Sequence, residues 1–149
     1  MVTCRQVVND DGPDWANLRQ ALWPDAVPGE HEEVIARYFS GTLKEPIMVL
    51  LAKDSDGRSV GFVELSLRAY AEGCDSDNVG YVEGWYVGRE VRGRGVGRAL
   101  IEAAEDWARQ VGCTELASDA QLDDAASAAA HKAVGFADVG RIRCFRKVL

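Results

Sequence analysis

The feature that most constrains the fold of this chain is a basic, glycine-rich segment that joins a strand-like run to a helix-like one. Residues 79–87 are mostly apolar and aromatic, which favours a strand. From residue 96 to residue 111, apolar residues recur at spacings of three and four, which predicts a helix with one buried face. The sequence therefore predicts a strand, a short loop and a helix whose first turn is fixed against the protein body.

The loop between these two elements has the composition of an anion site. The first amides of a helix have no partners within the helix and lie at the positive end of its dipole, which attracts anions. Glycines let a phosphate approach the backbone closely, and arginines add positive charge. The segment consists of Arg92, Gly93, Arg94, Gly95, Val96, Gly97 and Arg98. We interpret it as a pyrophosphate site, although a plain connector or a solvated helix start would also fit this composition.

The sequence of the loop differs from two well-known phosphate-binding motifs and matches a third. It contains no Gly-Lys-Ser/Thr triplet, and Arg98 stands where a dinucleotide-binding fingerprint needs glycine or alanine. The pattern Arg-x-x-Gly-x-Gly over 92–97 resembles the GNAT N-acetyltransferase superfamily, whose members bind the pyrophosphate of acetyl-coenzyme A (acetyl-CoA) on this loop. The pair Gly135 and Phe136, after a short helical pattern, fits the same resemblance.

The resemblance implies a fold and a domain organisation. A GNAT acyltransferase fold is α/β (α+β), with a central mixed, mostly antiparallel sheet flanked by about four helices. The chain has 149 residues, which is one domain's length, so we expect a single acetyltransferase domain over residues 1–149.

A narrower resemblance extends over nearly the whole chain. Six segments, in order, are similar to those of aminoglycoside 6′-N-acetyltransferases. They are Leu-Trp-Pro at 22–24, Tyr70 with Gly-Cys-Asp-Ser at 73–76, Val-Glu-Gly at 82–84, Ala-Ser-Asp at 117–119, His131 with Gly-Phe at 135–136, and Phe-Arg-Lys at 145–147. The resemblance implies direct transfer of acetyl from acetyl-CoA to the 6′-amine of aminoglycoside antibiotics, and hence antibiotic resistance.

The same resemblance implies the site residues and the partners. The aminoglycoside would contact Trp23, Tyr70, Glu83 and Asp119. Acetyl-CoA would lie along Trp85, Tyr86 and Val87, on the amides of residues 93–98, and near Asp124. Members of this group are commonly dimers, so a homodimer is expected.

Two carboxylates are the candidates for catalysis. Glu83 lies in an otherwise apolar strand, where an ionised carboxylate is costly unless it is paired or lines a cleft. Asp119 follows the next predicted strand of a parallel pair, so both side chains can reach one cleft. Acetyl transfer needs a group that accepts a proton from the attacking amine. Either carboxylate can take this role, and we favour Asp119 because a loop end is better placed for solvent access.

Three positions depart from the family pattern. His131 stands where many GNAT members have a tyrosine that protonates the leaving thiolate, and we expect a packed or hydrogen-bonded histidine there. Asp124 stands where close relatives tend to have asparagine, which puts a polar cofactor contact in question. Gly140 stands where some have a glutamate at the aminoglycoside site, so drug recognition or the subunit interface would differ.

Composition excludes several other classes of function. The net charge of −7 argues against nucleic-acid and anionic-membrane partners and is compatible with a cationic substrate. The apolar run 47–52 is too short to span a bilayer, and residues 1–5 do not resemble a signal peptide, so we expect a cytoplasmic protein. The four cysteines form no C-x-x-C pair, and no metal site is expected.

The remaining elements follow from local patterns. We expect strands at 4–8, 47–52, 60–67, 115–118 and 141–148, and helices from about residue 14 to residue 22, at 30–39 and at 125–134. His31, at the acidic start of the second helix, is expected to face solvent. Two other functions remain open: acetylation of another amine, such as a polyamine, an amino sugar or a protein N-terminus, and a non-catalytic acyl-CoA-binding module.

Overall fold

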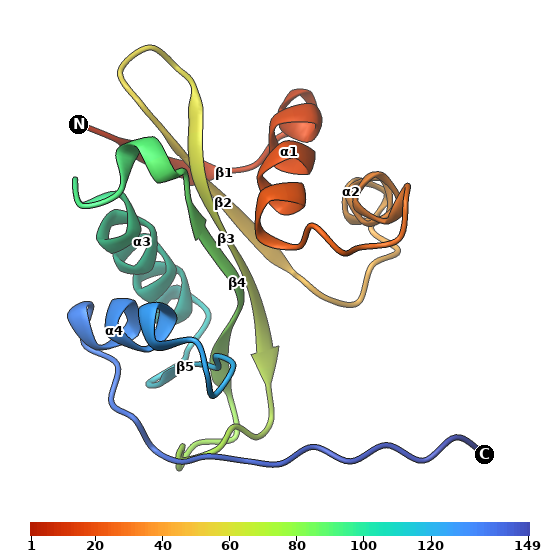
Figure 1. Cartoon of the computed structure of the whole chain (residues 1–149), viewed down its shortest axis with the longest axis vertical. Helices are drawn as coiled ribbons and strands as arrows, with labels where there is room; N and C mark the ends of the chain where they lie inside the picture. The colour runs from red at the N-terminus through yellow and green to blue at the C-terminus, as the bar shows by residue number, and fades with distance from the viewer.

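The computed structural model describes residues 1–149 and contains one five-stranded sheet. The strands lie in the order of the sequence (Figure 1). They are β1 Thr3–Gln6, β2 Met48–Lys53, β3 Ser59–Arg68, β4 Val79–Val87 and β5 Leu116–Ser118. The strands β1 to β4 pair antiparallel with one another, and β5 pairs parallel with β4. The predicted mixed, mostly antiparallel sheet is therefore confirmed, as is the parallel pairing of β4 with β5.

Four helices cover the two faces of the sheet. They are α1 Gly12–Leu22, α2 Glu30–Ser40, α3 Val96–Gln110 and α4 Ala125–Ala133, with short 3₁₀ turns η1 Asn9–Asp11 and η2 Arg89–Val91. The helices α1 and α2 lie on one side of the sheet, and α3 and α4 on the other (Figure 1). None of them combines the length and apolar character needed to cross a bilayer.

Strand alternation divides the core between these two faces. In β2, Val49 and Leu51 pack in one apolar cluster with Trp15 of α1, whereas Leu50 packs in another with Leu100 of α3. Successive side chains of a strand point to opposite faces, so a strand covered on both sides must be apolar throughout. This explains the unbroken apolar run in β2.

A β-bulge in β4 sets up the candidate site. Glu64 of β3 pairs with Gly84 and Leu65 pairs with Val82, so Glu83 is an extra residue without a partner. A bulge places two successive residues toward one face of the sheet. Here Glu83 and Gly84 both face the side of α1. Glu83 accepts hydrogen bonds from Ser66 and Arg68, and Gly84 packs against Trp23. The sequence predicted the strand and did not predict the bulge.

The strands β4 and β5 stay together for only part of their length. Their pairing covers Gly80 to Val82 of β4 and ends there. From Glu83 to Val87, one edge of β4 therefore has no neighbouring strand. Free N–H and C=O groups on such an edge are available to a ligand that also carries amides.

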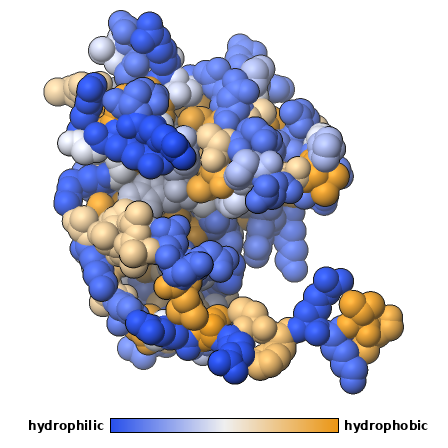
Figure 2. Space-filling model, viewed as in Figure 1, coloured by the Kyte–Doolittle hydropathy of each residue, from blue (hydrophilic) through white to orange (hydrophobic).

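Two predictions from the sequence are wrong. The predicted strand at 141–148 is absent: residues 137–149 form an extended arm that touches the loop before β4, where Val139 packs on Gly73, and that has no strand beside it (Figure 1). Figure 2 shows hydrophobic side chains on this arm, and Ile142, Phe145 and Val148 are all exposed. His31, predicted to face solvent, is 4% exposed because α2 turns it toward α1.

Candidate active site

The loop before α3 presents a set of free backbone amides. Gly93 and Gly95 have φ of 76° and 83°, a left-handed conformation that side chains other than glycine rarely adopt. The amides of residues 93–98 donate to no acceptor within the chain. A Cβ added at Gly93 or Gly95 would meet nothing within 4 Å, so the loop is open on its outer side. The geometry suits a diphosphate at the positive end of α3.

The three arginines around this loop do not share one role. Arg92 Nε donates to the carbonyl of Val87 at 2.9 Å and ties the loop to the end of β4. Arg98 Nη2 donates to the carbonyl of Ala133 at 2.7 Å and caps the end of α4. Arg94 is exposed and makes no hydrogen bond or ion pair. Arg94 is thus the arginine of this loop that remains free to pair with a ligand. The sequence alone did not separate it from Arg92 and Arg98.

Close packing connects the loop to the free edge of β4. A Cβ on Gly97 would lie 3.1 Å from Trp85 Cζ2, so a larger residue would crowd the indole where α3 approaches the strand. The predicted cofactor residues Trp85, Tyr86 and Val87 therefore lie between the bulge and the open loop. Asp124, a further predicted contact, caps α4 by accepting from the Ser127 amide at 2.9 Å.

Glu83 is held by two neighbours on β3. Arg68 Nη2 lies 2.9 Å from both carboxylate oxygens of Glu83, and Arg68 Nε donates to Oε1 at 3.1 Å. The Ser66 hydroxyl also donates to Oε1. The carboxylate is partly exposed, with 22% of its side chain open to solvent, so it is paired and still accessible.

Asp119 belongs to the same cluster through an aromatic ring. The Tyr81 hydroxyl donates to Asp119 Oδ2 at 2.5 Å, and the Arg68 guanidinium lies 3.6 Å from the centroid of the Tyr81 ring. Burial, and then this hydrogen bond, raise the pKa of Tyr81 well above its usual value. The hydroxyl therefore stays protonated near neutral pH and keeps donating to Asp119.

Trp23 packs on Gly84, the residue that follows Glu83. It caps the end of α1, and its indole packs on Gly84, where a Cβ would be 2.5 Å from Trp23 Cη2. The Phe62 ring meets it edge-on with centroids 6.1 Å apart. The bulge therefore directs Glu83 to the same face as Gly84, on which Trp23 packs.

Tyr70 makes no hydrogen bond to the other predicted substrate residues, although it lies two residues after Arg68. Its side chain is 67% exposed in the loop between β3 and β4. The negative charge of Glu72, followed by a hydrogen bond to it, raises the pKa of Tyr70. The structure connects Glu83 to Asp119 through Arg68 and Tyr81 and packs Trp23 on Gly84, whereas Tyr70 joins neither group.

His131 is fully hydrogen-bonded. Its Nδ1 lies 2.7 Å from the carbonyl of Ser127, which can only accept, so this nitrogen carries the proton. Nε2 then accepts from the Ser118 hydroxyl at 2.8 Å. The Trp85 ring meets the imidazole edge-on at 5.3 Å. The prediction of a packed, hydrogen-bonded histidine is confirmed.

Sequence reasoning missed Arg68, Ser66 and Tyr81. The signal was present: Ser66 and Arg68 are two residues apart on one strand, as Tyr81 and Glu83 are on the next, so each pair shares a face before the bulge intervenes. No cluster of three or more His, Cys, Asp or Glu side chains is arranged to hold a metal ion.

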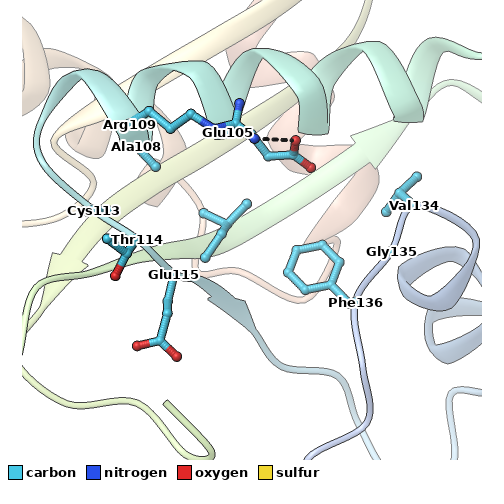
Figure 3. A pocket seen from close by; sticks show the side chains of 10 residues that line it. Glu105, Ala108, Arg109, Cys113, Thr114, Glu115, Val134, Gly135 and Phe136 are labelled. Atoms are coloured by element: carbon cyan, nitrogen blue, oxygen red, sulfur yellow. Dashed lines mark hydrogen bonds and ion pairs between the residues drawn. The ribbon is translucent and has the colours of Figure 1, made fainter. Parts of the chain in front are cut away.

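A separate groove lies beside β5, away from these residues (Figure 3). It has a volume of about 600 Å³. It is lined by Glu105, Ala108, Arg109, Cys113, Thr114, Glu115, Leu116, Val134, Gly135 and Phe136. None of these is a predicted substrate or cofactor residue, and the edge of β5 that faces away from β4 has no partner strand.

Comparison with known proteins agrees with this geometry. The sequence model of the acetyltransferase (GNAT) family matches residues 14–136. An aminoglycoside N(6′)-acetyltransferase type 1 from Klebsiella aerogenes is 51% identical over 145 residues, which cover 97% of this chain and 95% of the relative. The enzyme of the same name from Stenotrophomonas maltophilia is 42% identical over 148 residues, or 99% and 94% of the two chains.

Solved structures of aminoglycoside acetyltransferases share the fold of this chain. The structure of AAC(6′)-Iy in complex with the bisubstrate analogue CoA-S-monomethyl-acetylneamine superposes with a TM-score of 0.91 at 31% identity, covering 100% of this chain and 99% of the other. AAC(6′)-Ih from Acinetobacter baumannii superposes with a TM-score of 0.89 at 31% identity, with coverage of 100% and 99%. By its loop, its sheet and these similarities, the chain belongs to the acetyltransferase (GNAT) family.

Proposed function

We propose that the enzyme transfers the acetyl group of acetyl-CoA directly to the 6′-amine of aminoglycosides. The observation that carries this proposal is the single cluster formed by Glu83, Arg68, Tyr81 and Asp119, with the indole of Trp23 packed on Gly84, the residue after Glu83. An aromatic surface next to carboxylates suits a sugar ring that carries ammonium groups. The Klebsiella and Stenotrophomonas relatives are named for the same reaction.

Acetyl-CoA fits the opposite part of the site. Its diphosphate would accept hydrogen bonds from the amides of Gly93 to Arg98, with Arg94 free to pair with a phosphate. Its amide-bearing arm would pair with the free edge of β4 between Trp85 and Val87. When bound, it supplies a thioester carbon that an unprotonated amine can attack. An amide at Val87 would stabilise the negative charge that develops on the carbonyl oxygen.

Asp119 is the better candidate for the group that takes the amine's proton. Glu83 shares both of its oxygens with Arg68, so its charge is already compensated. Asp119 accepts from the neutral Tyr81 hydroxyl and forms no ion pair. It can therefore attract a substrate ammonium and accept one proton from it, directly or through water, as the new C–N bond forms.

His131 has no proton to give at its Nε2 in this arrangement. Its only proton is on Nδ1 and is donated to a backbone carbonyl, while Nε2 accepts from Ser118. We therefore give it a structural role, which is to hold α4 against Trp85 and β5. Protonation of the departing thiolate is left to solvent.

The exposed arm at residues 137–149 is the basis for proposing a homodimer. A stable chain rarely leaves Ile142, Phe145 and Val148 exposed along one extended segment. Each copy also has the groove of Figure 3 beside the unpaired edge of β5. In a twofold pair, each arm could add to the β5 edge of the other copy, which would cover both surfaces at once.

We expect the enzyme to act in the cytoplasm, where acetyl-CoA is available. All four cysteines are free thiols, which suits a reducing compartment.

Release of free thiol from acetyl-CoA tests the proposed reaction. The purified protein should release thiol with neomycin, which carries a 6′-amine, and release little with paromomycin, which has a 6′-hydroxyl at that position. Spermidine and a peptide with a free N-terminus test the other amine classes. Equal rates with neomycin and paromomycin would mean that another amine is acetylated, and no release with any amine would leave only an acyl-CoA-binding role.

A further inference from the structure

A second polar cluster lies beneath the proposed substrate surface and takes no part in the chemistry described above. Glu64 of β3 is 2% exposed, Arg19 of α1 is 8% exposed and His31 of α2 is 4% exposed. Trp15 Nε1 donates to Glu64 Oε1 at 3.1 Å, and Arg19 Nη1 donates to the same oxygen. Burial raises the pKa of Glu64, and the positive charge of Arg19 opposes this shift. Buried groups of this kind are costly unless their bonds are satisfied.

His31 completes the cluster in one particular tautomer. Arg19 Nε donates to His31 Nδ1 at 3.0 Å, so Nδ1 must be unprotonated. His31 Nε2 therefore carries the proton and donates to the carbonyl of Trp23 at 3.2 Å. This carbonyl lies just beyond the end of α1, where backbone oxygens lack helical partners. The neutral imidazole thus links Arg19 to the backbone of Trp23.

Arg19 also contacts the indole of the same tryptophan. Its guanidinium carbon is 4.7 Å from the centroid of the Trp23 ring, while Gly84 supports the ring from β4. Trp23 is therefore held at its carbonyl by His31 and at its ring by Arg19. Glu64 supports both contacts, because its ion pair with Arg19 fixes the guanidinium that contacts His31 and the Trp23 ring.

We propose that Glu64, Arg19 and His31 act as positioning residues that hold Trp23 in place for substrate binding, and that they do so only while His31 is neutral. A second proton on His31 would place an N–H on Nδ1 directly against the N–H of Arg19 Nε, with two positive charges in contact. The hydrogen bond would be lost and the ring would turn away. The inference rests on the proposed function, since it takes Trp23 to be a wall of the aminoglycoside site.

The charged group in direct contact with His31 is the guanidinium of Arg19, which disfavours a second positive charge on the ring. From α1 it faces Arg19, and from β3 it faces Glu64 through Arg19. On its own helix the neighbouring carboxylates are the exposed Glu30, Glu32 and Glu33, none of which hydrogen-bonds to the ring. Acidification should therefore weaken aminoglycoside binding. The opposite trend is expected from the drug itself, because its amines gain charge as the pH falls.

Calorimetric binding of kanamycin to the full-length enzyme, at pH 8 and at stepwise lower pH, tests the inference. His31→Ala should raise the Kd for kanamycin about tenfold at pH 8, the loss expected for a hydrogen bond of about 1.4 kcal/mol. The Kd for acetyl-CoA should not change. His31→Asn keeps an acceptor toward Arg19, so it should bind more tightly than His31→Ala and lose the acid-side weakening. Glu32→Gln, an exposed change on the same helix, is the matched control and should behave as wild type.

A double-mutant cycle identifies the route of the effect. If His31 acts through Trp23, then His31→Ala should add little to the loss of kanamycin binding already caused by Trp23→Ala. Additive losses, an equal rise in the Kd for acetyl-CoA, or wild-type kanamycin affinity in a folded His31→Ala protein would each overturn the inference. A wild-type enzyme that neither binds nor acetylates aminoglycosides would instead overturn the proposed function, so the two failures are distinguishable.

Discussion

The guanidinium of Arg68 lies on the carboxylate of Glu83, with Nη2 2.9 Å from each oxygen. A positively charged side chain of the enzyme therefore already occupies the carboxylate that would attract a polycationic drug. A bound ammonium group can reach Glu83 only by sharing it with Arg68 or by displacing that side chain. Because 38% of the Arg68 side chain is exposed, such a displacement is open to it.

Replacing Arg68 with glutamine should therefore strengthen drug binding. Removal of one positive charge at about 7 Å in water is worth about 0.6 kcal/mol, so the KM for kanamycin should fall about threefold. The gain should shrink as salt is added, since screening weakens the attraction. Arg68→Lys keeps the charge and serves as the control. If both variants raise KM alike, Arg68 serves instead to orient Glu83.

Substitutions of Asp119 and of Glu83 should affect different kinetic constants. Asp119→Asn keeps an acceptor for Tyr81 but cannot take a proton, so kcat should fall about a hundredfold while the KM for acetyl-CoA stays constant. Glu83→Gln should mainly raise the KM for the drug, because it leaves the positive charge of Arg68 without its partner at the site of a cationic substrate. Steady-state kinetics with both substrates varied would measure this. A greater loss of kcat in Glu83→Gln would reverse the assignment.

Gly84 should tolerate no side chain while Trp23 is present. A Cβ at Gly84 would lie 2.5 Å from Trp23 Cη2 and 2.8 Å from Cζ2, so Gly84→Ala must push the indole aside. We expect a raised KM for kanamycin and a loss of about 1 to 3 kcal/mol in unfolding free energy, as for other overpacked sites. In a Trp23→Ala background the same change should be nearly neutral. Equal losses in both backgrounds would place the strain in the strand itself.

Acid sensitivity of the fold should depend on Asp11. Its carboxylate accepts from Arg5 at 2.7 and 2.9 Å and from the Val8 amide at 2.8 Å, and it pairs with Lys53 at 3.1 Å. The bond to Arg5 is the main cause of a pKa well below the usual value. A carboxyl with a lowered pKa stabilises the fold above the pKa of the unfolded state, and this contribution is lost as the pH falls.

Urea unfolding at several pH values would measure that contribution. Asp11→Asn should lower the unfolding free energy at pH 7 by about 2 kcal/mol, and the difference from wild type should shrink as the pH drops below about 4. Asp10→Asn, at the exposed neighbouring residue, should have little effect at any pH. A difference that is the same at every pH would mean that the Asp11 contacts do not depend on its charge.

The parts of the structure that depend on neighbouring residues were predictable from the sequence. The loop at 92–98 follows from glycine and arginine spacing and a helical period, and the structure has α3 starting at Val96 as expected. The pairing of β2 with β3 follows from the turn residues between them. The helix α1 ends at Leu22 as predicted, since the next residue, Trp23, precedes a proline.

The parts that depend on contacts between distant segments were not predictable. His31 reads as a solvated residue among glutamates, and only the packing of α2 against α1 makes it buried. The bulge at Glu83 leaves no mark in an apolar strand, yet it decides that Glu83 and Gly84 share a face. Arg68 was overlooked because its partner Glu83 is on another strand, 15 residues away along the chain.

The arm at residues 137–149 reads as a strand because its apolar residues alternate, and an alternating segment needs a neighbour to pair with. If that neighbour is β5 of a second copy, wild type should behave in light scattering as a particle of about twice 16.2 kDa. Phe145, which is 88% exposed in the single chain, should then lie in an interface. Phe145→Asp should yield a folded monomer, since burying the new carboxylate is costly.

The exposed Arg58→Asp, on the hairpin between β2 and β3, adds a charge far from the arm and is the matched control, which should stay dimeric. Truncation after Phe136 should give the same monomer as Phe145→Asp. A wild-type protein of 16.2 kDa at every concentration would refute the exchange of arms. A dimer that survives both changes would place the interface on another face, because the arm is then not what joins the two copies.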